Sequence, residues 1–273
     1  MGLREEGSQS AQGEQAGPAL PQAVTQTHGY SSLSVNMPNL VEVPLDFSSL
    51  EESLHGALQF LATTTIPPAV VGPALLPKES VHEGRLTLVL DLDETLSHCR
   101  LEMLVQRPDF CVQFEESKAT GYVYVRPFAR LFLEVAAQLF EVVIFTASSQ
   151  GYADQVIDQL DPEKRCSSRL YRQHCSEVSG GFLKDLRRLG RTLERTVLVD
   201  NSLVSLALCP DNGIVVSNWT AEDPEDRELL ELLLVLQQCM MQDSVPEFLA
   251  RRYGLRALVE LLRQEPDCFA KQR

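Results

Sequence analysis

Residues 86–98, "LTLVLDLDETLSH", join a continuous apolar run to two aspartates that stand one residue apart. An apolar run of strand length without polar alternation is typical of a parallel strand that is buried on both faces. Residues i and i+2 leaving a strand can face the same way, so Asp91 and Asp93 can point into one pocket. Two carboxylates about 4 Å apart repel by roughly 4 kcal/mol at an effective dielectric constant of about 20. The pair therefore predicts a nearby cation or a shared proton, and Mg²⁺, which prefers oxygen ligands, fits that need.

Two further apolar runs of the same kind also lead into polar residues. They are "EVVIF", residues 141–145, before Thr146, and "RTVLV", residues 195–199, before Asp200. In open parallel sheets, ligands bind in the crevice beyond the carboxyl ends of the strands. We therefore expect Asp91, Thr146 and Asp200 to converge on one crevice, where Asn201 supplies a further oxygen.

Helical patterns separate these runs. Five apolar residues repeat at helical spacing after Pro127, a favoured first helical residue, and three repeat after the second run. The two sets are Phe128, Leu131, Phe132, Val135 and Leu139, and then Tyr152, Val156 and Leu160. Strands that alternate with helices predict an α/β fold with a parallel sheet flanked by helices. A fourth strand is expected in "GIVVSNW" from Gly213, with helices near residues 229–236 and over 245–262.

The interval 97–122 does not fit this alternation. "FCVQFE" and "GYVYVR" have strand composition, and turn-prone residues lie between them. This pattern predicts a small β insertion that projects over the sheet near the active site.

The chain as a whole divides into four parts. Residues 1–45 are rich in Gln, Ser, Gly and Pro, which predicts a disordered tail. Residues 46–84 should form a short helix and a Pro-rich tether that contains "IPPAVVGPALLP". Residues 85–264 should form the folded domain, and residues 265–273 a C-terminal tail.

Composition excludes several classes of function. The 273 residues carry a formal net charge of −14, which argues against sequence-independent binding to nucleic acid. The seven cysteines are odd in number and include no CxxC pair, as expected of reduced thiols in the nucleus or cytoplasm. No apolar stretch approaches the length of a membrane span, so we expect no membrane association.

Four motifs identify a family resemblance. "DLDETL", "FTAS", "FLKDL" and "VLVDNS", in this order, resemble the signature motifs of the haloacid dehalogenase superfamily. The residues within these motifs are similar to those of the FCP/SCP-type phosphatases of that superfamily, which include phosphatases acting on the carboxy-terminal domain of RNA polymerase II. The resemblance runs from about Leu86 to Leu262, and the flanks are similar to the small phosphatase-like branch. It implies a haloacid-dehalogenase (Rossmann-like) sheet.

The resemblance implies a role for each motif residue. Asp91 would be the nucleophile that forms an aspartyl-phosphate. Asp93 would protonate the leaving oxygen and later accept a proton from water, and the carboxylate beside it is a physical reason for a raised pKa. Thr146 and Lys184 would stabilise the phosphoryl group as charge spreads over its oxygens. Without the other motifs, Lys184 in "FLKDLRRLG" would be interpreted as part of a charged helix face.

The resemblance also implies a metal and a peptide pocket. Mg²⁺ would be bound by Asp91, the backbone carbonyl of Asp93 and the side chain of Asn201, with Asp200 close behind, through water or by orienting the motif lysine. The residues implied to bind substrate are Arg172, Tyr152 and Leu101. Tyr152 is equally compatible with a core position, and Arg172 with a surface charge. Three departures from the family pattern concern substrate choice: Leu203 in place of proline, Thr220 after the tryptophan in place of an aromatic residue, and Leu101 in place of an aromatic residue.

The sequence thus supports three functional hypotheses. The first is a Mg²⁺-dependent phosphatase, monomeric, that acts on phosphoserine or phosphothreonine in a protein or peptide partner. The second is a non-catalytic binding or scaffold protein on the same fold. The third is a small-molecule phosphatase, although such enzymes have a larger cap than the short insertion predicted here.

Overall fold

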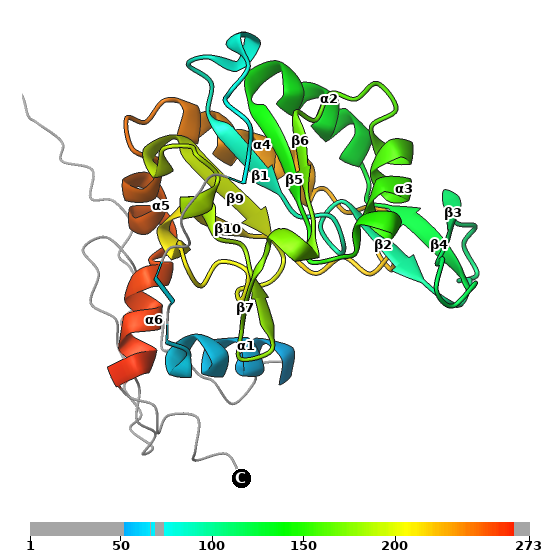
Figure 1. Cartoon of the computed structure of the whole chain (residues 1–273), viewed down its shortest axis with the longest axis horizontal. Helices are drawn as coiled ribbons and strands as arrows, with labels where there is room; N and C mark the ends of the chain where they lie inside the picture. The colour runs from blue at the N-terminus through cyan, green and yellow to red at the C-terminus, as the bar shows by residue number, and fades with distance from the viewer. Residues whose placement is uncertain (1–51, 66, 69–73, 265–273) are drawn as a thin grey trace, which may run out of the picture. The chain divides into compact units, whose positions relative to one another are not determined.

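The computed structural model describes residues 52–65, 67–68 and 74–264 of the chain (Figure 1). The tails expected at residues 1–45 and 265–273 lie outside the described residues. Within the described ranges, no helix is long and apolar enough to cross a membrane.

A five-stranded parallel sheet forms the centre of the fold, in the strand order β10-β9-β1-β5-β6 (Figure 1). The three predicted runs are its inner strands: β1 (Thr87–Leu90), β5 (Glu141–Phe145) and β9 (Thr196–Asp200). The edges are β10 (Gly213–Val215) and β6 (Ser168–Leu170). Leu90 is level with Ile144 of β5 and with Val199 of β9, so the three inner strands end together. The predicted α/β class is confirmed.

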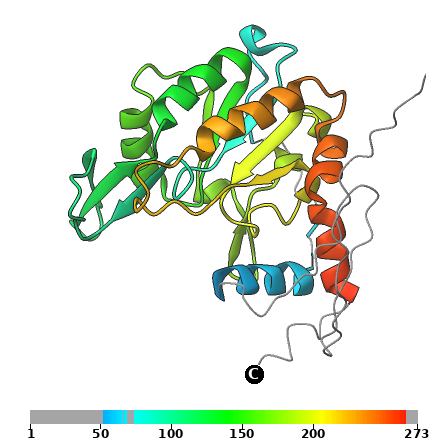
Figure 2. The same cartoon turned by 180° about the vertical axis from the view of Figure 1, so that it is seen from behind.

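The first face of the sheet packs against four helices. Alternate strand residues such as Leu88 and Leu90 point to this face, where they are completely buried. The helices are α2 (Ala129–Leu139), α3 (Gln150–Leu160), α4 (Glu228–Met240) and α5 (Val245–Tyr253). Figure 2 shows α4 and α2 next to each other over the strands. This face is therefore covered by helices, and the other face is covered as well. Burial on both faces explains why the strands lack polar alternation.

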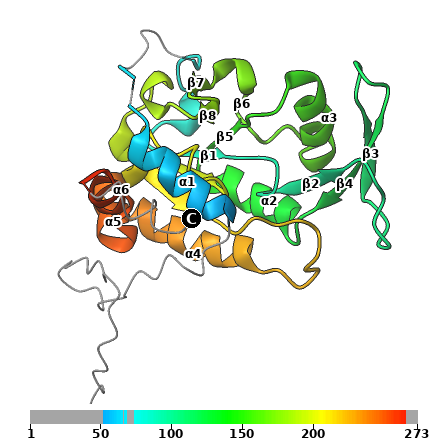
Figure 3. The ribbon, with the colours of Figure 1, turned by 90° about the horizontal axis from the view of Figure 1, so that it is seen from below.

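The second face carries a hairpin and two helices from opposite ends of the chain. Val89 points to this face. Its cover includes β7 (Ser176–Val178), β8 (Gly181–Leu183), α1 (Glu52–Thr63) and α6 (Leu255–Gln264). Helices α1 and α6 lie against each other (Figure 3), with Leu58 and Leu262 buried between them beside Leu203.

The predicted β insertion is a separate antiparallel sheet in the order β2-β4-β3. Its strands are β2 (Ser97–Arg100), β3 (Phe110–Gln113) and β4 (Thr120–Val125). A Cβ on Gly121 would lie 2.7 Å from Sγ of Cys99 and 2.9 Å from Phe114 and Val112, so any larger residue would have to displace these side chains. Short 3₁₀ turns complete the chain: η2 (Ser80–His82), η3 (Arg172–His174), η4 (Leu186–Arg188), η5 (Leu193–Arg195) and η6 (Pro210–Asn212).

The structure corrects several details of the predicted elements. Helix α2 begins at Ala129 because Phe128 has a φ of 65°, which is outside the helical region. Leu131 and Leu139, assigned to its apolar face, are 48% and 39% exposed. The helix expected over 245–262 is broken at Gly254, whose φ of 62° ends α5. Strand β6 and the β7–β8 hairpin were not predicted, because three-residue strands give too short a pattern.

Candidate active site

Lys184 lies between two aspartates at the carboxyl end of the sheet. Asp91 follows β1, Asp200 ends β9, and Lys184 follows β8 on the second face. The ammonium Nζ lies 2.5 Å from Oδ1 of Asp91 and 2.6 Å from Oδ2 of Asp200. Only 1% of Lys184 is exposed, so its interpretation as part of a charged helix face is wrong.

The charges at this point do not balance. The ammonium group of Lys184 contacts two carboxyl groups, those of Asp91 and Asp200, and the carboxyl of Asp93 acts on Asp91 as a third. Burial raises the pKa of the Asp91 carboxyl to about 7, while the Lys184 ammonium opposes this rise. Burial alone would lower the pKa of Lys184, but its contacts with Asp200 and Asp91 raise it above the ordinary value. The lysine is therefore charged, and an excess of acidic groups remains.

The side chain of Asp93 has other partners than that of Asp91 and accepts three hydrogen bonds. The Tyr152 hydroxyl donates to Oδ1 at 2.6 Å, and the hydroxyls of Ser148 and Thr146 donate to Oδ2 at 2.7 and 3.3 Å. Burial is the largest cause of the raised pKa of Asp93. Burial is thus a larger cause than any neighbouring carboxylate, and the Glu94 carboxylate adds to the rise. The repulsion expected between Asp91 and Asp93 raises the pKa of Asp91.

A turn places the hydroxyl of Thr95 between two oxygens at the end of the sheet. Glu94 adopts a φ of 57°, and its N–H donates to the carbonyl of Ser97, which closes the turn after β1. The buried Thr95 Oγ1 lies 3.1 Å from Oδ2 of Asp91 and 3.4 Å from Oδ1 of Asn201. The oxygens of Asp91 and Asn201 are therefore close together.

These oxygens have the chemistry of a magnesium site. A carboxylate, a backbone carbonyl and a side-chain amide oxygen are hard ligands, and Mg²⁺ keeps several waters besides one or two carboxylates. Within the described part of the chain, no hydrogen bond is made to the carbonyl of Asp93. Among all residues that the structure describes, no group of three His, Cys, Asp or Glu side chains is placed to bind a metal. The donor set at Asp91, Asp93 and Asn201 therefore fits Mg²⁺ and does not resemble a zinc site.

An open pocket adjoins Asp93. Tyr152 stacks on Phe114 of the insertion, with ring centroids 5.5 Å apart, while its hydroxyl donates the hydrogen bond to Asp93. Arg172 lies over the ring of Phe182 and donates from Nε to the carbonyl of Ala147 at 2.6 Å. The three predicted substrate-binding residues all line this pocket, whose lining is Asp93, Glu94, Cys99, Arg100, Leu101, Phe114, Ser148, Ser149, Tyr152 and Arg172.

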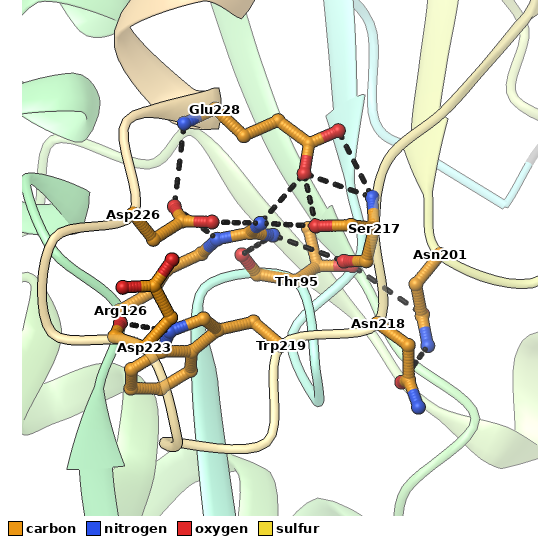
Figure 4. A network of polar contacts seen from close by, with 9 residues as sticks. All are labelled: Thr95, Arg126, Asn201, Ser217, Asn218, Trp219, Asp223, Asp226 and Glu228. Carbon is orange, nitrogen blue, oxygen red and sulfur yellow. Dashed lines mark hydrogen bonds and ion pairs between the residues drawn. The ribbon is translucent and has the colours of Figure 1, made fainter.

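A second buried cation, Arg126, lies behind the turn (Figure 4). Its guanidinium contacts both carboxylate oxygens of Asp226, at 2.9 and 2.8 Å, and Glu228 at 2.7 Å. It also donates to the carbonyl of Thr95 at 3.3 Å and to the carbonyl and hydroxyl of Ser217 at 3.2 and 2.7 Å. This network joins the Thr95 turn to the segment before α4.

Sequence reasoning missed some of these residues. Ser148 stands inside the motif "FTAS", so its hydroxyl could have been proposed as a partner of Asp93. Arg126 stands in "YVRPF", but its partners Ser217 and Asp226 lie far away along the chain. Nothing in the local pattern predicts that pairing.

Comparison with known proteins gives consistent matches. Residues 86–246, more than half of the chain, match the family described as NLI interacting factor-like phosphatase. CTD small phosphatase-like protein 2 of Dictyostelium discoideum is 39% identical over 74% of this chain and 35% of its own length. CTD small phosphatase-like protein of Mus musculus is 39% identical over 72% of each chain. The chain thus spans about a third of the first relative and seven tenths of the second.

A solved structure aligns more weakly. The RNA polymerase II CTD phosphatase Fcp1 superposes on 70% of this chain and 53% of its own, with 21% sequence identity and a TM-score of 0.44.

Proposed function

Because the chain belongs to the family of NLI interacting factor-like phosphatases, we propose that it is a Mg²⁺-dependent phosphatase that acts on phosphoserine or phosphothreonine in proteins. The observation that carries the proposal is the placement of Lys184 between Asp91 and Asp200, beside a separately held Asp93. One carboxyl group is thus paired with a cation, and the other is half-buried and accepts hydrogen bonds from neutral hydroxyl groups. This difference suits one to attack and the other to transfer a proton.

In the first step, an oxygen of Asp91 forms a bond to phosphorus while the bond from phosphorus to the ester oxygen breaks. Asp93 gives its proton to the departing serine or threonine oxygen, so a neutral alcohol leaves. The raised pKa of Asp93 keeps that proton available. The phosphoryl group is then held as an aspartyl-phosphate.

In the second step, a water molecule gives its proton to Asp93 as its oxygen attacks phosphorus. The bond between Asp91 and phosphorus breaks, and inorganic phosphate leaves. Lys184 balances negative charge on the phosphoryl oxygens in both steps, and Thr146 donates a hydrogen bond to them. Because Tyr152 and Ser148 are neutral donors, they orient Asp93 in either protonation state.

Bound Mg²⁺ would balance the remaining negative charge and favour the ionised form of Asp91. Its ligands would be the Asp91 carboxylate, the Asp93 carbonyl and Oδ1 of Asn201.

The pocket supports a polypeptide substrate. It is open, and its lining includes the apolar side chains of Leu101 and Phe114 together with Arg172. A Mus musculus relative, 41% identical over 64% of this chain, is named carboxy-terminal domain RNA polymerase II polypeptide A small phosphatase 2. We therefore propose that domain, or another phosphoprotein of the nucleus or cytoplasm, as the substrate.

The test is hydrolysis of phosphoserine and phosphothreonine peptides by the purified chain. Wild type should release phosphate with Mg²⁺ and lose activity in EDTA, and Asp91→Asn should be inactive. Full activity of Asp91→Asn would refute the mechanism. Faster hydrolysis of sugar phosphates than of phosphopeptides would instead support a small-molecule phosphatase. Tight phosphopeptide binding without turnover would support a binding protein.

A further inference from the structure

The carboxamide of Asn201 is held at both of its ends. Its Oδ1 lies 3.4 Å from the Thr95 hydroxyl, and its Nδ2 donates to Oδ1 of Asn218 at 2.9 Å (Figure 4). The Thr95 hydroxyl has one hydrogen and lies nearer to Asp91, at 3.1 Å, so its contact with Asn201 is the weaker one. The bond to Asn218 is therefore the stronger of the two contacts that orient the carboxamide.

Asn218 is itself fixed through both of its neighbours. The N–H of Ser217 donates to both carboxylate oxygens of Glu228 at 2.9 Å, and the N–H of Trp219 donates to the carbonyl of Glu94 at 3.0 Å. The Trp219 side chain is buried, and its indole N–H donates to the carbonyl of Asp223 at 3.0 Å. The side chain of Asn218 is exposed, but the backbone that carries it is anchored on each side.

Arg126 connects the two supports of Asn201. The same guanidinium contacts the carbonyl of Thr95, on the Oδ1 side, and Ser217, next to Asn218, on the Nδ2 side. It is completely buried and paired with Asp226 and Glu228, so its position is fixed. The Arg126 guanidinium therefore holds both the Thr95 turn and the backbone next to Asn218.

We propose that Asn218 is a positioning residue for the metal site: its side-chain oxygen holds Nδ2 of Asn201 and so keeps Oδ1 turned toward Asp91. The inference rests on the proposed function, because it assigns Oδ1 of Asn201 as a metal ligand. In the reversed carboxamide, Nδ2 would face the cation, and an NH₂ group with two donor hydrogens does not bind Mg²⁺. Groups that orient metal ligands commonly change metal affinity when they are replaced.

The test compares Asn218→Ala, Asn218→Asp and wild type as full-length chains. Asn218→Ala removes the acceptor, and we expect its affinity for Mn²⁺, measured by electron paramagnetic resonance, to fall about 10-fold. Asn218→Asp keeps an acceptor oxygen for Nδ2 and should bind Mn²⁺ at least as tightly as wild type. The Mg²⁺ concentration that gives half-maximal phosphopeptide hydrolysis should change in the same order. Thr220→Ala, two residues further on, is the matched control and should bind as wild type does.

The outcomes separate the role of Asn218 from the phosphatase activity on which it rests. Equal Mn²⁺ affinity of Asn218→Ala and wild type would overturn the inference and leave the phosphatase proposal intact. An equal loss in Asn218→Asp and Asn218→Ala would also overturn it, because the acceptor oxygen would then be irrelevant. A wild-type chain that neither binds Mn²⁺ nor hydrolyses phosphopeptides would overturn both proposals. The melting temperature without metal shows whether a variant has lost its fold, and Asn218→Asp, which retains the bond, then carries the decision.

Discussion

At the amino end of the parallel sheet, a carboxylate is surrounded by cations, whereas at the carboxyl end a cation is surrounded by carboxylates. Glu141 begins β5 and accepts from Arg191 through both oxygens, at 2.6 and 2.8 Å, with Lys78 at 3.2 Å and the Thr87 hydroxyl at 2.7 Å. Lys184 at the opposite end contacts two aspartates. Burial alone would raise the pKa of Glu141, but its donors lower it to about 2, whereas the pKa of Asp91 is raised.

The difference distinguishes an ion cluster that stabilises the fold, at Glu141, from one that is suited to catalysis, at Lys184. Every oxygen of Glu141 has a donor, and two cations compensate its single charge, so nothing further is needed there. Lys184 cannot compensate the acidic groups around it, and that excess suits the site to a metal ion. Stability should depend on the first end of the sheet, and activity on the second.

The largest expected effect is that of Lys184→Met. Loss of the cation that faces the phosphoryl group should reduce kcat by about 10²- to 10³-fold. Lys164→Met, which changes an exposed lysine after α3, is the matched control for phosphopeptide turnover. Wild-type kcat in Lys184→Met would show that the carboxyl end is only a structural ion cluster.

Glu141→Gln should affect stability instead. It leaves Arg191 and Lys78 without a counter-charge, and removal of one partner from a buried ion pair costs about 3 to 5 kcal/mol. The free energy of unfolding in urea at pH 7 should fall accordingly, while kcat of the folded enzyme stays unchanged. A large loss of kcat with unchanged stability would contradict the division between the two ends.

Acid should reproduce part of that loss in wild type. The pKa of Glu141 is lowered from 4.5 to about 2, so its stabilising contribution is complete above pH 4.5 and is lost as the pH falls toward 2. The shift corresponds to at most about 3 kcal/mol. Unfolding free energies of wild type and Glu141→Gln should therefore converge between pH 4.5 and 2. Parallel pH curves would exclude the assignment to Glu141.

Tyr152→Phe should give the smallest change. The substitution removes the 2.6 Å hydrogen bond to Asp93 but retains the ring that stacks on Phe114. The lost hydrogen bond, which helps to orient Asp93, is worth about 1 kcal/mol. Its loss should lower kcat about 5-fold and leave KM for a phosphopeptide nearly unchanged. Tyr122→Phe in β4 provides the same chemical change away from Asp93. A rise in KM alone would indicate that the hydroxyl contacts substrate rather than Asp93.

The sequence predicted the parts of the molecule that are coded locally. The apolar runs before Asp91, Thr146 and Asp200 identified the inner strands, because full burial removes polar alternation. The rule that ligands bind at the carboxyl ends of such strands then brought these residues to one edge. The position of Lys184 came only from the family motif, since the hairpin that carries it has strands of three residues.

Other features depend on contacts between distant segments. Asn218 reaches Asn201 across 17 positions, and Arg126 reaches Asp226 across 100. No local pattern encodes such pairs. The raised pKa of Asp93 has the same origin, because its largest cause is burial, and burial depends on how distant segments pack.

The packing of α1 against α6 sets a practical boundary for producing the protein in shortened form. The family match covers residues 86–246, yet Leu58 and Leu61 of α1 and Leu262 of α6 are buried on the second face of the sheet. A fragment cut to the matched residues would expose Leu203 and its apolar neighbours to solvent, and contiguous patches of this kind cause aggregation. A soluble fragment must therefore begin before α1 and extend past the end of α6.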